Sequence, residues 1–162
     1  MTLLNDDMKH HKLILSALLV FSSSAFSKGV AVTIEDADLR SSNESISAVV
    51  KKNPSFSPFE TLKCKITGKE ISLATSSDGH TYFATTADAC GWGGALGPIW
   101  LVDQSQGTVI LSTGGYAVKV KQRVRHGFHD VDVSSGTAGE TMSGSYFFDG
   151  KKYIAAKKRA HQ

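Results

Sequence analysis

The sequence predicts a β-rich α+β protein: an antiparallel sheet or partly closed barrel of about eight short strands, with one N-terminal helix. Short stretches rich in apolar residues recur at intervals of about ten residues, and clusters of Gly, Asp and Ser separate them. Helical periodicity is confined to one stretch near the start of the domain. A pure β-sandwich is the alternative architecture.

The helix is expected over residues 43–52. Its apolar side chains, between Ile46 and Val50, recur at i, i+3 and i+4 and so share one face. Ser41-Ser42 can supply the N-cap, because a serine hydroxyl accepts from the free backbone N–H groups of a first turn. Asn53-Pro54 ends the helix, since proline disfavours a helical residue before it.

After Pro58 the period becomes two, which is typical of strands. Aspartate-glycine pairs at Asp78-Gly79 and Asp149-Gly150 predict tight hairpin turns, because both residues tolerate positive φ. The predicted strands cover residues 59–66, 70–75, 81–85, 99–102, 108–112, 116–124, 130–134, 143–148 and 152–155, with a short strand or arm at 28–34.

Residues 1–27 have the pattern of a cleavable export signal. A basic head at Met8–Lys12 precedes the uncharged apolar run Leu13–Phe21, and the small residues Ala25 and Ser27 follow. A run this short does not span a bilayer core, which needs about 20 residues. The segment therefore predicts a secreted or periplasmic protein without a transmembrane segment.

Cleavage after residue 27 leaves a single β-rich domain, 28–156, and a basic flexible tail, 157–162. The formal net charge of the chain is +3, and apart from Lys157-Lys158-Arg159 in the tail the two signs are nearly balanced. A nucleic-acid-binding protein would carry a basic stripe, so nucleic acid is not an expected partner.

The chain has two cysteines, Cys64 and Cys90. An even number in an exported domain predicts one disulfide, which would close a loop and stabilise the domain by on the order of 3 kcal/mol. Two free thiols, one of them nucleophilic, are the alternative.

Four segments in residues 99–153 occur in a recognisable order: Ile99–Val102, Gly107–Leu111, Arg125–Val131 and Tyr146–Tyr153. This order resembles a group of small exported bacterial proteins of unknown function in which the patterns W-x-V, G-[FY]-x-D-[LV] and Y-x-F-D-G-K-x-Y succeed one another. The resemblance implies a series of hairpins and a periplasmic location, and no particular activity.

The segment Ser143-Gly144-Ser145-Tyr146 is similar to the S-G-x-Y motif of periplasmic lysozyme inhibitors, whose loop enters the lysozyme cleft. The resemblance implies that Ser143, Gly144 and Tyr146 contact a partner protein. A glycine turn leading into a strand that buries the tyrosine is the alternative.

Residues 90–98, CGWGGALGP, form a glycine-rich loop around Trp92. Aromatic side chains on a rigid loop are typical anchors of protein interfaces. A disulfide at the start of the loop would reduce the cost of ordering it on binding. Trp92 is therefore a candidate partner-binding residue, whereas Trp100 lies in an apolar strand and is expected in the core.

His126, His129 and Asp130 are the densest group of possible metal ligands, with the aspartate exposed on the strand face beside a turn. A catalytic Zn²⁺ site needs three N or O ligands and an open position. This group supports an alternative function, a small metal-assisted hydrolase of envelope material. A solvated polar hairpin explains the same residues without chemistry.

No complete catalytic constellation is visible in the sequence. We therefore expect a non-enzymatic binding protein that needs no cofactor, an inhibitor or protector of another cell-envelope protein. The sequence leaves the oligomeric state open.

Overall fold

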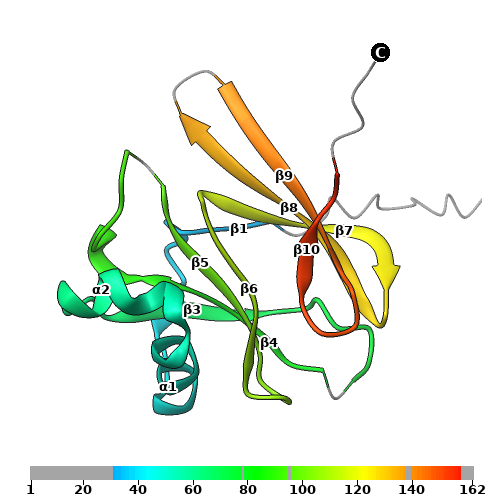
Figure 1. The fold of residues 1–162 in the computed structure, drawn as a ribbon, viewed down its shortest axis with the longest axis horizontal. Coiled ribbons are helices and arrows are strands. Elements are labelled where there is room, and N and C mark those ends of the chain that lie inside the picture. The colour runs from blue at the N-terminus through cyan, green and yellow to red at the C-terminus, as the bar shows by residue number, and fades with distance from the viewer. Residues whose placement is uncertain (1–30, 78, 95, 138–139, 158–162) are drawn as a thin grey trace, which may run out of the picture.

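A computed structural model describes residues 31–77, 79–94, 96–137 and 140–157 of the chain. Within these residues, ten strands form two five-stranded antiparallel sheets, accompanied by two α-helices (Figure 1). The prediction of a β-rich α+β fold is confirmed, and the sheets are not closed into a barrel. The expected signal segment, 1–27, and all of the tail except Lys157 lie outside the described residues.

The first sheet has the order β1-β7-β8-β9-β10 and the second has the order β2-β3-β4-β5-β6. The strands of the first sheet are β1 (Ala31–Thr33), β7 (Ala117–Arg125), β8 (Phe128–Thr137), β9 (Glu140–Phe148) and β10 (Tyr153–Ala155). Those of the second are β2 (Arg40–Ser41), β3 (Ile66–Ile71), β4 (Thr81–Thr86), β5 (Gly97–Asp103) and β6 (Thr108–Gly115).

The predicted helix is present as α1 (Glu44–Lys52), but its cap differs from the expected serines. The Asn43 side chain accepts a hydrogen bond from the Ile46 backbone N–H at 2.8 Å. Asparagine is as good an N-cap as serine. The Ser42 hydroxyl instead donates to the Ile66 carbonyl and contacts Ser47.

The strand predicted over residues 59–66 is wrong. A 3₁₀ turn (η1, Pro54–Phe56) and α2 (Ser57–Thr61) stand there, with Pro58 in the first turn of α2, where its missing N–H costs nothing. The break between the strands predicted at 59–66 and 70–75 is also wrong, because Gly68 lies inside β3. A Cβ at Gly68 would come within 1.9 Å of the Phe83 carbonyl oxygen, so only glycine fits this close strand pairing.

The second sheet is covered on both faces. Alternate residues of β5 face opposite ways, so Ile99 and Leu101 join the core between the two sheets while Trp100 and Val102 join a core beneath the helices. This explains why the β5 sequence is a continuous apolar run rather than an alternating one. The order of layers is helices, second sheet, first sheet.

Two further features join the sheets. The chain passes from β6 to β7 at Gly115, where a Cβ would meet Val133 Cγ1 at 2.6 Å, so glycine allows this close approach. At the other end, residues 73–75 pair with residues 127–129: His129 N–H donates to the Leu73 carbonyl at 2.8 Å. On the side of the Gly115 junction, the β8–β9 hairpin extends past the rest of the fold (Figure 1).

Candidate binding site at the disulfide-tethered loop

The predicted disulfide is present and joins Cys64 to Cys90, 26 residues apart in sequence. Cys64 follows α2 and its N–H donates to the Phe59 carbonyl, while Cys90 follows a short 3₁₀ turn (η2, Ala87–Ala89). The bond therefore fastens the glycine-rich loop to the helical layer. A restrained loop loses less conformational entropy on binding, which favours binding.

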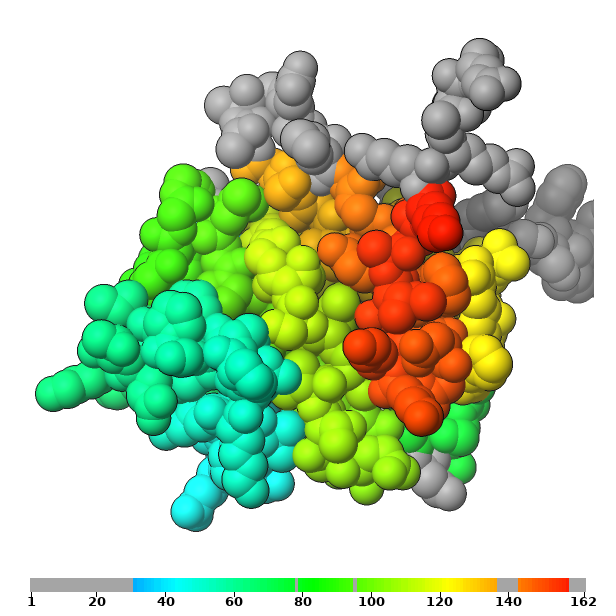
Figure 2. Space-filling model, viewed as in Figure 1, coloured from blue at the N-terminus to red at the C-terminus, as the bar shows by residue number. Residues whose placement is uncertain are grey.

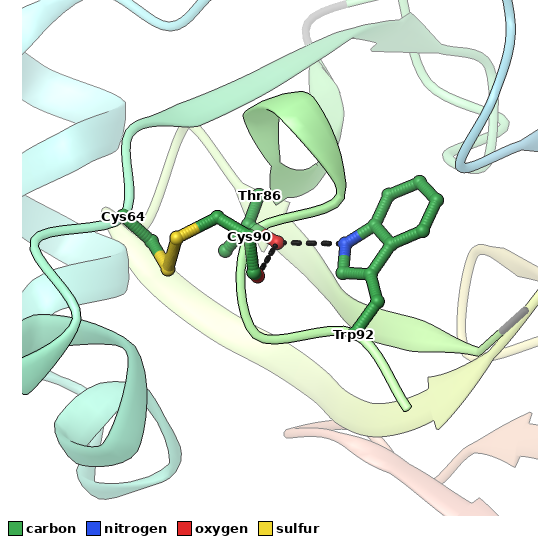
Figure 3. Close-up of a disulfide and its surroundings, with 4 residues drawn as sticks. All are labelled: Cys64, Thr86, Cys90 and Trp92. Atoms are coloured by element: carbon green, nitrogen blue, oxygen red, sulfur yellow. Dashed lines mark hydrogen bonds between the residues drawn. A yellow bond between two sulfur atoms is a disulfide. The ribbon is translucent and has the colours of Figure 1, made fainter. Parts of the chain in front are cut away.

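Trp92 is held by the fold rather than presented to solvent. Its indole Nε1–H donates to Thr86 Oγ1 at 2.8 Å, and Thr86 Oγ1–H donates to the Cys90 carbonyl at 2.7 Å (Figure 3). The ring lies over Gly97, where a Cβ would come within 2.7 Å of Nε1. Trp92 is half-buried against the core between the sheets, so it stabilises the loop and its N–H is already satisfied.

A groove of about 470 Å³ lies on the opposite side of this loop, on the helical face of β5 and β6. Helical, loop and strand segments meet there: Phe59 from α2, Leu96 from the loop, and Gly114 from β6. Figure 2 shows these segments meeting on one face, with the helical layer in cyan, the loop in green and β6 in yellow-green. The groove volume falls within the range of about 300–1,000 Å³ typical of ligand pockets.

The base of the groove is rigid. Trp100 is 1% exposed and its ring meets Phe59 edge-on, with centroids 5.5 Å apart. Its indole N–H donates to Ser55 Oγ at 2.7 Å, and Ser112 Oγ–H donates to the same oxygen at 2.6 Å. Buried aromatic stacking and satisfied hydroxyls fix the side chains before any partner arrives.

The groove walls are uncharged and combine apolar side chains, glycines and hydroxyls. Of the described residues that line it, none carries an ionisable side chain. Phe59 and Leu96 are half-buried, and Leu62, which is 58% exposed, lies beside Gly91 at the rim. Large apolar side chains at the surface, rimming a pocket, are typical of binding sites.

The hairpin residues predicted to contact a partner approach the same region from the other side. Ser143 is exposed, whereas Tyr146 is half-buried, packs against the core and lies over Gly144. The Tyr146 hydroxyl lies 3.4 Å from Thr113 Oγ1, and Thr113 lines the groove. Thr113 pairs with Ile99, so Tyr146 reaches β6 on the side that faces the core between the sheets, whereas the groove lies on the helical side.

The three proposed metal ligands are not brought together. His126 is exposed on the β7–β8 turn with a φ of 49°, while His129 Nδ1 donates to the Lys121 carbonyl at 2.7 Å. Within the described ranges, no group of three His, Cys, Asp or Glu side chains could hold a metal ion.

Asp130 was expected to be exposed and is instead 6% exposed. Its Oδ2 lies 3.3 Å from Arg125 Nη2 and 3.9 Å from Arg123 Nε, and the Arg125 guanidinium lies 4.1 Å above the Phe147 ring centroid. Two arginines therefore compensate the buried carboxylate. This arrangement ties β7 to β8 and β9 through Oδ2, whereas Asp130 Oδ1 makes no hydrogen bond among the described residues.

Apart from Trp100, five groove residues lie outside the loop at 90–98: Ser55, Phe59, Ser112, Thr113 and Gly114. Phe59 was expected in a strand, and no role was expected for Gly114. The helix-starting Pro58 was the available signal for Phe59. No local signal identifies Gly114, because its importance arises only from pairing of β6 with β5.

The fold and the site define a two-sheet α+β protein with an uncharged surface groove beside a disulfide-tethered loop. None of the helices in the described part of the chain is long and apolar enough to cross a membrane. Comparison with protein-family models, with curated proteins and with solved structures finds no match for this chain.

Proposed function

We propose that this protein is a non-enzymatic binding protein of the bacterial cell envelope that holds an uncharged apolar segment of another protein in the groove beside the disulfide. The groove's uncharged lining is the observation that carries the proposal. A charged partner group would lose its hydration there without gaining a counter-ion, which is costly. An apolar side chain gains from the same desolvation.

The shape of the groove supports a peptide occupant. Gly93, Gly97 and Gly114 line it, and a Cβ at Gly93 would meet nothing within 4 Å. Glycine lets a second backbone approach closely. Loop glycines and strand hydroxyls supply polar partners for a backbone, and Phe59 and Leu96 supply apolar contacts for its side chains.

The disulfide supports the envelope as the site of action, since disulfides persist in oxidising compartments. The export pattern of residues 1–27 points to the same compartment. A bound segment is blocked or shielded by the groove, so the protein would act as an inhibitor or protector of an envelope protein. This action needs no catalytic group.

Filling the groove tests the proposal. Gly114 is exposed, and a Cβ there would meet only the Gly97 carbonyl oxygen, at 4.0 Å, so Gly114→Gln adds bulk without a clash. Thr108→Gln is the matched control, because Thr108 is exposed at the other end of β6 and does not line the groove. Both proteins are immobilised and exposed to envelope extract, and the captured proteins are quantified by mass spectrometry.

The proposal predicts at least one protein captured equally by wild type and Thr108→Gln and depleted at least about tenfold with Gly114→Gln, a loss of about 1.4 kcal/mol in binding. Equal capture by all three proteins would contradict it. Thermal unfolding of each variant shows whether the substitution has changed the fold instead of the groove.

A further inference from the structure

A second cavity in the described part of the chain is separate from the groove. This inter-sheet cleft, of about 730 Å³, lies where the loop after β3 meets β7 and β8, and Ser76, His80, Gln122 and His129 are among its lining residues. It therefore contains residues of both sheets. Its volume is also that of a site for a small organic ligand.

A bulge in β7 shapes one wall of the cleft. Val120 pairs with Val131 and Val124 pairs with His129, so residues 121–123 stand opposite Asp130 alone. The extra residues bend β7 and place Lys121 and Gln122 at the cleft. Bulges of this kind often re-aim side chains beside functional sites.

The bulge also orients His129. The Lys121 carbonyl, at 2.7 Å from Nδ1, can only accept, so the proton of the neutral ring sits on Nδ1 and the lone pair sits on Nε2. A second contact fixes the backbone here, because the Tyr153 hydroxyl donates to the His129 carbonyl at 2.6 Å. His129 therefore offers a positioned hydrogen-bond acceptor in the cleft wall.

Both lysines at the cleft are already paired with carboxylates. Lys69 Nζ lies 2.7 Å from Asp36 and 3.0 Å from Asp38, and Lys121 Nζ lies 3.1 Å from Asp132. An anionic ligand would have to displace one of these carboxylates, whereas a neutral ligand would not. Glu70, which also lines the cleft, accepts a hydrogen bond from the Gln104 side-chain amide at 3.2 Å.

The remaining wall has an apolar floor and a polar rim. Ile71, Ala74 and Val120 supply the floor. The rim has hydroxyls, an amide and imidazoles, which both donate and accept. Thr81, also in the wall, is 1% exposed, and its Oγ1 has no hydrogen-bond partner among the described residues.

We propose that the inter-sheet cleft binds a neutral oligosaccharide. A sugar ring has an apolar C–H face that matches the floor and hydroxyl edges that each donate and accept, which matches the rim. The ring hydroxyl nearest His129 donates to Nε2. This site is distinct from the groove and does not depend on a protein partner there.

Three neutral trisaccharides (triacetylchitotriose, cellotriose and maltotriose) are titrated into the ¹⁵N-labelled protein, with inorganic phosphate as the charged probe. The readouts are the His129 imidazole ¹⁵N resonances and the backbone amides of the cleft. The variants are His129→Ala and Gln122→Ala, and His126→Ala is the matched control, since His126 is three positions away on the exposed turn and does not line the cleft.

At least one trisaccharide is expected to shift the Nε2 resonance and to bind at least about tenfold more weakly to His129→Ala, with affinity for His126→Ala unchanged. If His129→Ala does not fold, Gln122→Ala, whose exposed side chain makes no hydrogen bond to another described residue, is expected to weaken binding instead. The proposal is overturned if no trisaccharide shifts the resonance, if the cleft variants bind like wild type, or if phosphate shifts it as strongly.

Discussion

Removing the indole of Trp92 should destabilise the fold rather than remove a solvent-exposed partner-binding side chain. In well-packed cores, Trp→Ala costs about 3–5 kcal/mol. Trp92 is half-buried, so its packing over Gly97 is expected to contribute about half of that, about 2 kcal/mol. The lost hydrogen bond leaves the buried Thr86 hydroxyl without its donor and adds about 1 kcal/mol.

Urea unfolding followed by far-UV circular dichroism separates these contributions. Trp92→Ala is expected to lower the free energy of unfolding by about 2–3 kcal/mol, and Trp92→Phe, which keeps a ring over Gly97, by about 1 kcal/mol. The groove lies on the other side of the loop, so Trp92→Phe should still capture the partner. A Trp92→Ala protein within about 0.5 kcal/mol of wild type would refute this packing.

Three further predictions concern the disulfide and the shifted ionisations. Replacing Cys64 and Cys90 by alanine should lower the free energy of unfolding by about 3.5 kcal/mol, measured in urea; an unchanged midpoint would argue against the chain-entropy account. Burial, and then the charge of a nearby aspartate, raise the pKa of Tyr153, so its stabilising contribution is present below pH about 10 and is lost as pH rises further. Tyr153→Phe should therefore reduce the fall in the free energy of unfolding above pH about 10. An unchanged fall would show that the Tyr153 hydroxyl is not responsible. Burial alone would raise the pKa of Asp36, but hydrogen bonds, of which that from Lys69 is the strongest, lower it below its ordinary value. The carboxylate therefore stabilises the fold above pH about 4 and loses this effect as pH falls further. Asp36→Asn should be less stable than wild type above pH about 4 and approach the stability of wild type below it. A constant difference at all pH values would show that the ion pair is not responsible.

Local patterns were sufficient where one face of an element is buried. The apolar face from Ile46 to Val50 predicted α1, and the alternation in β7 predicted a half-exposed strand. The apolar run in β5 predicted a core strand, and Trp100 is in the core as expected. The two cysteines predicted the disulfide, because two cysteines can form only one intramolecular pair.

Local patterns failed where tertiary contacts decide. Phe59 fits a strand period as well as a helix, and packing against Trp100 favours the helix. Gly68 resembles a turn residue until β4 pairs closely with it. Asp130 resembles an exposed ligand until the bulge in β7 brings Arg125 to it.

The candidate site could likewise be predicted only where local sequence patterns determine it. The sequence identified the loop at residues 90–98, but the groove depends on Gly114 and Phe59, which reach it from distant parts of the chain. The direction of the Trp92 side chain is likewise set by Thr86, across the loop. Such placements depend on strand register, which a single sequence specifies only through the finished fold.

Photo-crosslinking from the groove tests the central proposal most directly. A photoreactive phenylalanine derivative is introduced at Gly93, which has open space at its Cβ position, and separately at Thr108 as the control. After irradiation in envelope extract, the crosslinked partner peptide is sequenced by mass spectrometry. The account predicts an adduct from position 93 alone, to a segment of a partner protein that is apolar and carries no charged residue at the crosslink. Identical adducts from both positions, or a charged segment at the crosslink, would contradict it.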